Sequence, residues 1–320
     1  MREKSKSILK LRQPHYDGVG AQLLRIFAAF AISKDWKMGF AYDLLKDIDN
    51  KVFKVREDEL KQWNEFLLNL LPIGRDISNQ SFLEIKHRNH RKLKLYAVIN
   101  TLDLIGIPVI HVINSPQAIT NKDPRILGNI NFEESIKKYR KPRKHNTLRV
   151  VLHIRQGELG LSQFRDRYLP LAYFESFLSN LLPRLNHLGI KYDVTVTVEP
   201  GQNNLLQGED PKIIESIKID PSNPHLISVK NNFFRIQHEK PTHNLTPYLK
   251  KAKWLAPATS WTDFQRFISA DILVLSKSSF SYLAGVLNGS AIVVCPEFWH
   301  PLLPGWHTTQ NIDEIIRRLL

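Results

Sequence analysis

The chain has 320 residues and a mass of 37.1 kDa, and 42% of its residues are hydrophobic, 24% charged and 10% aromatic. These proportions exclude collagen-like, low-complexity and disordered proteins, and the length allows two domains. The formal net charge is +14, and most of it belongs to residues 1–150, where 28 Lys and Arg stand against 16 Asp and Glu, compared with 17 against 15 in the remainder.

The first half of the chain begins with a short alternating strand and a glycine loop. The pattern of apolar residues predicts strands at 8–11 and 108–113 and helices at 21–36, 58–71 and 90–104. A charged and polar stretch at 137–147 contains Pro142, which breaks a helix, so we place the domain boundary there. The predicted domains are 1–145 and 146–320.

The second half alternates strands and helices more regularly. Strands are predicted at 149–154, 193–198, 226–229, 272–275 and 291–294, and helices at 171–188, 211–218, 262–269 and 280–287. This alternation is typical of βαβ units and a parallel sheet. Ligands bind at the carboxyl ends of such strands, so the loops that begin at His153, Glu199, Ser276 and Cys295 are expected at one edge.

The sequence favours the cytoplasm. The longest apolar run, Leu23 to Ile32, is too short to span a membrane, and Met1 to Arg12 has no apolar signal core. Cys295 is the only cysteine, which excludes an internal disulfide and a thiolate zinc cage within one chain. The basic first half would also suit peripheral contact with the cytosolic face of a membrane.

The strand that ends in His153-Ile154-Arg155-Gln156-Gly157-Glu158 is the first segment with a chemical signal. It places a guanidinium where the sheet opens, and the planar fork of arginine suits a phosphate. Arg155 is therefore the leading candidate for an anion ligand. The alternative is an ion pair of Arg155 with Glu158 or Asp166.

The second segment runs from Ser276 to Ser281, where an apolar strand turns into a serine-rich helix start. Hydroxyls, backbone N–H groups and the positive end of the helix dipole meet there, which favours an anion. Serines also cap helices without any ligand.

The third segment is the glycine loop with Gly18, Gly20 and Gln22. Two glycines allow a ligand to approach the backbone closely. The loop lacks the third glycine of the dinucleotide fingerprint and the Gly-Lys-Ser/Thr ending of a P-loop, so neither NAD binding nor ATP hydrolysis is indicated.

Taken in order, the three segments resemble the fucosyltransferase superfamily, which includes the α-1,2- and α-1,6-fucosyltransferases and the protein O-fucosyltransferases. Members have a glycine loop near the N-terminus, a His-x-Arg-Arg-Gly-Asp-like strand end and a late Ser-x-Ser-Ser-Phe-Ser segment. These correspond here to Gly18–Gln22, His153–Glu158 and Ser276–Ser281. The serine segment is the most specific of the three.

The resemblance implies an α/β fold of the GT-B type, with two Rossmann-like domains facing each other across a cleft. It implies that the N-terminal domain takes the acceptor and the C-terminal domain binds a nucleotide sugar, with GDP-fucose favoured. Together with the strand-end argument it indicates these donor-binding residues: His153, Arg155, Gly157, Glu199, Ser276, Ser278, Ser279 and Phe280. The acceptor or cleft residues are His15, Gly18, Gly20 and Gln22.

Catalysis is assigned to Arg155, Asp17 and Glu158. A fixed arginine and helix N–H groups would stabilise the charge that develops on the β-phosphate as GDP leaves, so no metal and no other cofactor is expected. Asp17 is the first choice for a general base, with His15 and Glu158 as alternatives. Gln156 and Glu158 depart from the family pattern, which has arginine and aspartate there.

We therefore expect an inverting glycosyltransferase that transfers fucose to a glycan or lipid-linked oligosaccharide. One alternative is a transferase fold that has lost activity, because of Gln156. Another is a non-catalytic protein that binds anions or nucleic acid through the basic clusters 86–94 and 137–145. Nucleic acid is disfavoured because no aromatic residues interleave a basic stripe.

The tail from Cys295 to His307 combines aromatic residues with turn residues. Trp299 and Trp306 would serve either as stacking surfaces for a sugar or base, or as packing residues of a returning C-terminal segment.

Overall fold

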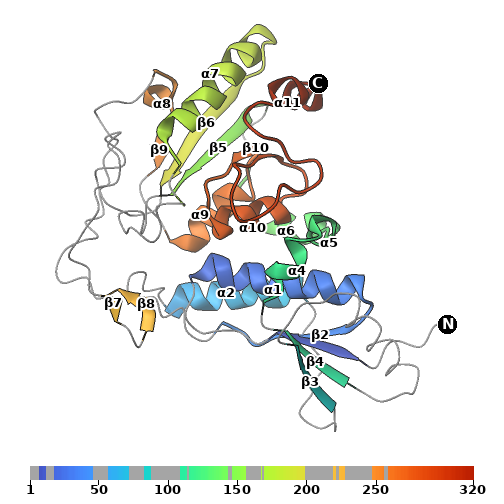
Figure 1. Cartoon of the computed structure of the whole chain (residues 1–320). Coiled ribbons are helices and arrows are strands. Elements are labelled where there is room, and N and C mark those ends of the chain that lie inside the picture. The colour runs from blue at the N-terminus through green and yellow to red at the C-terminus, as the bar shows by residue number, and fades with distance from the viewer. Residues whose placement is uncertain are drawn as a thin grey trace. The chain divides into compact units, whose positions relative to one another are not determined.

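The computed structural model divides into two compact units, Met1–Ser135 and Ile136–Leu320, and each is described by itself (Figure 1). The α/β class with parallel sheets is confirmed. The structure describes residues 7–11, 18–45, 57–71, 83–87, 109–113, 115–142, 146–155, 167, 169–198, 219–220, 223–227, 247–255 and 259–320.

The first unit is built on a four-stranded parallel sheet in the order β2-β1-β4-β3. The strands are β1 (Ile8–Leu11), β2 (Gly39–Ala41), β3 (Leu83–His87) and β4 (Val109–Ile113). The predicted strands at 8–11 and 108–113 are confirmed. Sequence patterning missed β2, which has only three residues, and β3, which runs into the first basic cluster.

Helix α1 (Val19–Asp35) is the centre of this unit and is buried on almost every side. Its end needs a left-handed residue, which is Lys37 with φ of 57°, and the N–H of Met38 then donates to the Ser33 carbonyl at 2.8 Å. Helix α2 (Glu57–Leu70) contacts α1 through the rings of Phe66 and Phe27. The predicted helices at 21–36 and 58–71 are thus confirmed, whereas the one at 90–104 lies outside the described residues.

Two short helices complete the first unit, α4 (Gln117–Thr120) and α5 (Pro124–Gly128), and a third, α6 (Glu133–Ile136), ends at the first residue of the second unit. Helix α5 begins with proline, whose fixed φ and missing N–H suit the first turn of a helix.

The second unit contains a five-stranded parallel sheet in the order β11-β10-β5-β6-β9. The strands are β5 (Leu148–Ile154), β6 (Tyr192–Val198), β9 (Lys253–Leu255), β10 (Ile272–Val274) and β11 (Ile292–Val294). Four of the five predicted strands of this half correspond to β5, β6, β10 and β11. Strand β9 was missed, since its three residues, Lys-Trp-Leu, form neither an apolar run nor an alternation long enough to recognise.

Alternate residues of the central strand β5 face two different layers. Val150 and Leu152 belong to a core that includes Phe177 of α7 (Leu171–His187) and Ile315 of α11 (Ile312–Leu319). His153 points the other way and meets Phe267 of α9 (Ser260–Phe267). Figure 1 shows α7 on one side of the sheet and α9 and α10 (Ser279–Leu287) on the other.

A left-handed glycine ends α7. Gly189 has φ of +67°, and the N–H of Ile190 donates to the Leu185 carbonyl at 2.9 Å, which closes a Schellman motif. This turn sends the chain directly into β6.

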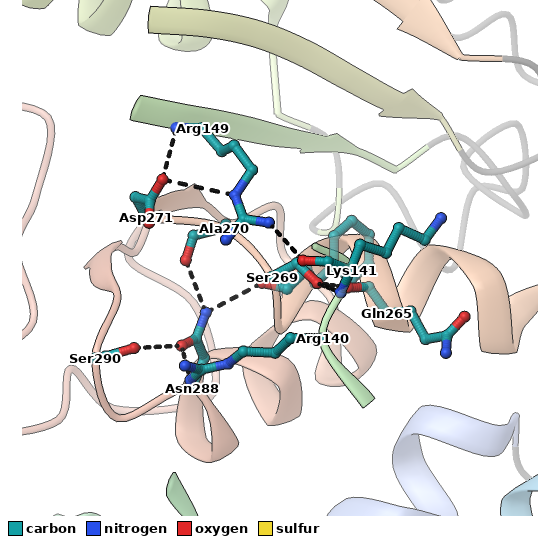
Figure 2. Close-up of polar contacts among 10 residues, drawn as sticks. Arg140, Lys141, Arg149, Gln265, Ser269, Ala270, Asp271, Asn288 and Ser290 are labelled. Atoms are coloured by element: carbon teal, nitrogen blue, oxygen red, sulfur yellow. Dashed lines mark hydrogen bonds and ion pairs between the residues drawn. The ribbon is translucent and has the colours of Figure 1, made fainter. Parts of the chain in front are cut away.

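Residues 136–142 belong to the second unit because they are bound to the amino ends of its strands (Figure 2). The Nη2 of Arg140 donates to Oδ1 of Asn288 at 2.7 Å, and the Lys141 N–H donates to Oγ of Ser269 at 2.7 Å. Arg149, which donates to the Lys141 carbonyl, also pairs with Asp271 at 3.6 Å. The division of the chain therefore falls at 135/136, whereas the sequence prediction placed it at 145/146.

The remaining elements are β7 (Ile219–Asp220), β8 (Asn223–Ile227), α8 (Pro247–Lys251) and the 3-10 turn Lys137–Tyr139. Strands β7 and β8 form an antiparallel pair, which overlaps the predicted strand at 226–229. The predicted helix at 211–218 lies outside the described residues. Among the helices that the structure describes, none is sufficiently long and apolar to cross a membrane.

Candidate functional site

The candidate site lies at the carboxyl edge of the second sheet, between β5 and β10. The chain runs outward from β5 through β6 to β9 and then returns to β10 on the other side of β5. Ligands of open parallel sheets bind where the strand order reverses in this way. Arg155 directly follows β5, and the serine segment follows β10, so the two motifs border the same reversal point.

A hydrogen bond joins these two motifs. Nη1 of Arg155 donates to the carbonyl oxygen of Lys277 at 3.2 Å, and the Arg155 residue is half-buried. The contact holds the guanidinium beside the first turn of α10. Because the amino end of a helix carries partial positive charge, the two groups together favour a bound anion.

The serines of the second motif differ in their surroundings. Ser276, Ser278 and Ser281 are at most 1% exposed, whereas Ser279 is half-buried. Oγ of Ser278 caps α10 by accepting from the Phe280 N–H at 3.3 Å, and Oγ of Ser281 donates to the Ser278 carbonyl at 3.4 Å. Ser279 is thus the least buried serine of this group.

Ser276 and His153 form a closed pair in the interior. Oγ of Ser276 lies 2.8 Å from Nδ1 of His153, and His153 is 1% exposed. The imidazole ring also packs on Phe267 with a centroid distance of 4.9 Å. The pair ties the end of β5 to the end of β10, and both groups were predicted to bind the donor.

Ser279 and His300 form a second pair at the boundary of the interior. Oγ of Ser279 lies 2.9 Å from Nε2 of His300, which is 6% exposed. Burial lowers the pKa of His300 to about 4, since a charged imidazolium would lose its hydration. His300 is therefore neutral at physiological pH.

Aromatic packing holds His300 in place. Its ring lies 4.6 Å from the Tyr282 ring and 5.2 Å from the Phe298 ring, measured between centroids. The Tyr282 hydroxyl donates to the Pro301 carbonyl at 2.8 Å, which fixes the segment around His300 to α10. His300 was not predicted as a site residue, because 21 positions separate it from Ser279 and no local pattern links the two.

Two other residues at this edge were not named. Lys277 is half-buried between the end of β10 and α10, and its backbone carbonyl accepts from Arg155. Thr197, the register neighbour of His153, is 2% exposed, and its Oγ1 has no hydrogen-bond partner among the described residues. In the sequence, Lys277 could have been recognised because a serine stands on each side of it. Thr197 could not, because it does not differ from the other alternating residues of β6.

The predicted acceptor-side residues that the structure describes belong to the first unit. Gly18 is the N-cap of α1, and a Cβ placed there would meet no atom of the described residues within 4 Å. Gly20 and Gln22 lie in the first turns of α1, and Gln22 is 2% exposed.

Five residues of the predicted site lie outside the described residues: His15, Asp17, Gly157, Glu158 and Glu199. Their assigned roles as base, cleft and donor-binding residues stay predictions. The same holds for an ion pair of Arg155 with Glu158 or Asp166.

The two tryptophans of the tail have different environments. Trp306 packs against α10, where a Cβ on Gly285 would approach its ring to 3.1 Å, so this close contact favours glycine. Trp299 is 39% exposed, and the guanidinium carbon of Arg167 lies 5.2 Å from its ring centroid. Packing accounts for Trp306, whereas Trp299 presents surface near His300.

Neither thiolate nor metal chemistry is indicated by the described residues. Cys295 is buried, and burial raises the pKa of its thiol to about 12, which leaves it protonated. In the part of the chain that the structure describes, no three His, Cys, Asp or Glu side chains form a group that would hold a metal ion.

Comparison with known proteins adds no relative. Protein-family models, curated proteins and solved structures were searched, and none matches this chain. The resemblance to fucosyltransferases therefore depends on the three sequence segments.

Proposed function

We propose that the chain is an inverting glycosyltransferase that transfers fucose from GDP-fucose to a hydroxyl group of a glycan or lipid-linked oligosaccharide. The observation that supports it best is the contact of Arg155 with Lys277 at the reversal between β5 and β10. The proposal includes a GT-B arrangement, in which the first unit takes the acceptor and the second unit binds the donor.

The reaction breaks one bond and forms one bond at the anomeric carbon. The acceptor oxygen attacks this carbon from the face opposite the diphosphate, the carbon–oxygen bond to the β-phosphate breaks, and its electron pair leaves with GDP. The acceptor proton passes to a base, for which Asp17 is the first candidate. Arg155 and the N–H groups at the start of α10 stabilise the departing charge, so that no metal is needed.

The partners follow from this chemistry. The donor is a GDP-sugar, and the acceptor is a glycan or a lipid-linked glycan reached at the cytosolic face of a membrane. The excess of basic residues in 1–150 supports contact with an anionic surface. The second basic cluster has a structural use as well, because Arg140 is bound to Asn288 in the second unit.

Binding of GDP, UDP and ADP to the purified chain, measured by calorimetry, tests the proposal. We expect GDP to bind selectively and Arg155→Ala to weaken it by on the order of ten-fold to a hundred-fold, since a charged hydrogen bond to phosphate is lost. Arg155→Lys should restore only part of the affinity, because an ammonium group lacks the planar fork.

Arg317→Ala is the matched control. Arg317 is exposed on α11, so this variant removes the same charge without touching the candidate site, and its GDP affinity should equal that of the wild type.

When a panel of nucleotide sugars is offered in a transfer assay, GDP-fucose should be the donor that is consumed. If no nucleotide binds and polyanions bind in a salt-sensitive way instead, the non-catalytic alternative replaces this proposal.

A further inference from the structure

The pair formed by Ser279 and His300 is the basis of one further inference, which rests on the proposed function. Ser279 is the first residue of α10, and its Oγ lies 2.9 Å from Nε2 of His300. Ser276, Ser278 and Ser281 are each at most 1% exposed, whereas Ser279 is half-buried. Ser279 is therefore the serine of this segment with most contact with solvent.

The direction of the hydrogen bond decides what Ser279 can offer. A neutral imidazole carries one proton, so Nε2 is either a donor or an acceptor. If Nε2 accepts, the Ser279 proton is used inside the protein. If Nε2–H donates, the Ser279 oxygen accepts from His300, and the serine proton is left for an acceptor at the site.

The neighbours of Ser279 favour the second arrangement when an anion is bound. The first turn of α10 supplies backbone N–H donors, of which that of Phe280 is already capped by Ser278, and the guanidinium of Arg155 contacts the carbonyl of Lys277, two residues before Ser279. A phosphate oxygen is the acceptor that such donors share. The hydroxyl contributes to binding only if its own proton points the same way.

We propose that His300 is a positioning residue whose Nε2–H donates to Oγ of Ser279, so that the Ser279 hydroxyl donates to a phosphate oxygen of the nucleotide sugar. The ring is held for this task by Tyr282 and Phe298, and the hydroxyl of Tyr282 fixes Pro301 beside it. His300 itself does not touch the ligand. Its effect on binding passes through Ser279.

A double-mutant cycle with GDP as the probe tests this role. Ser279→Ala and His300→Leu should each weaken GDP binding by on the order of ten-fold, and the double variant should bind no more weakly than either single variant. His300→Gln should bind within about three-fold of the wild type, because the amide N–H of glutamine can donate from nearly the same place. Ser260→Ala, at the half-buried first position of α9, is the matched control and should leave GDP binding unchanged.

An additive cycle, with a loss of about a hundred-fold in the double variant, would overturn the role of His300 and leave the proposed function intact. Absence of GDP binding by the wild type would remove the proposed function, and with it the ligand of this contact. These two failures are therefore distinguishable.

A spectroscopic measurement keeps the inference testable if His300→Leu does not fold. Two-bond nitrogen–proton correlation spectra of the wild-type protein report which ring nitrogen carries the proton. We expect the Nε2–H form of His300 in the GDP complex. In Ser279→Ala, the change in the Nε2 chemical shift that the hydrogen bond to Ser279 causes should be lost. The Nδ1–H form in that complex would overturn the proposal.

Discussion

Two serine–histidine hydrogen bonds in the C-terminal unit have nearly the same length and different surroundings. The Ser276–His153 pair, at 2.8 Å, is closed on all sides, with both residues at most 1% exposed. The Ser279–His300 pair, at 2.9 Å, has a buried histidine and a half-buried serine. In the closed pair, removal of one partner leaves the other buried without any hydrogen-bond partner, because water does not reach it. In the second pair, water can take the place of the Ser279 hydroxyl. The first pair is therefore suited to stability and the second to recognition.

The largest expected effect is that of His153→Ala. The variant leaves Ser276 without its partner and a cavity beside Phe267, so the free energy of unfolding should fall by about 4 kcal/mol. Urea unfolding at neutral pH measures this change in the free energy of unfolding. His153→Asn, whose amide can replace Nδ1, should recover part of the loss, and a change below about 1 kcal/mol in His153→Ala would contradict the closed pair.

The second effect concerns pH. Burial lowers the pKa of His300 from 6.5 to about 4, so between these values the unfolded state binds a proton that the folded state does not. The contribution of neutral His300 to the free energy of unfolding is therefore fully present above about pH 6.5. It falls as the pH drops toward 4, by roughly 3 kcal/mol at most. Unfolding of wild type and His300→Gln across this range measures it. Equal pH dependence in both proteins would show that His300 is not responsible, since His307, whose pKa is also lowered by burial, is present in both.

The third effect is that of Ser276→Ala, which should lower the free energy of unfolding by about 1–2 kcal/mol. The loss is smaller than for His153→Ala because only a hydroxyl is removed, but Nδ1 of His153 stays buried without that partner. Thermal unfolding should show the shift, and Ser290→Ala, an exposed serine of the same unit, provides a baseline. A variant as stable as the wild type would mean that water reaches His153.

The smallest effect on stability is expected for Ser279→Ala, at most about 0.5 kcal/mol, because solvent can satisfy Nε2 of His300. The same variant should show the loss of GDP affinity described above. The two measurements together separate the pairs: a large loss of stability in Ser279→Ala would place this serine with Ser276 rather than at a ligand site.

The regular elements of the second unit were largely predictable from the sequence. Strand β5 contains the apolar run Val150-Val151-Leu152, and α7 repeats apolar residues at helical spacing, from Phe174 and Phe177 to Leu185. Strands β2, β7 and β9 escaped prediction because they have two or three residues and no wholly β-branched or aliphatic run, whereas β10 and β11, also of three residues, are the apolar runs Ile-Leu-Val and Ile-Val-Val. The compact units divide at 135/136 and the predicted domains at 145/146, and the hydrogen bond from Arg140 to Asn288, which attaches the segment between these positions, joins residues 148 positions apart.

The candidate site was predictable in its outline and not in its detail. Sequence reasoning identified Arg155 and the serine segment as strand-end motifs of one sheet, and the structure places them at the same reversal of strand order. It treated Ser276, Ser278 and Ser279 as equivalent. Their difference arises from burial and from the partner of each hydroxyl, which a motif does not contain.

The sequence by itself determined the α/β class, the strand-end position of Arg155 and the turn into α10, because these depend on local periodicity and on residues that neighbour one another in the chain. Only the tertiary structure decided the strand order, the attachment of residues 136–142 and the pairing of Ser279 with His300. Each of these is a contact between distant segments. Such contacts are selected by packing and by the need to satisfy buried polar groups, which operate in space rather than along the chain.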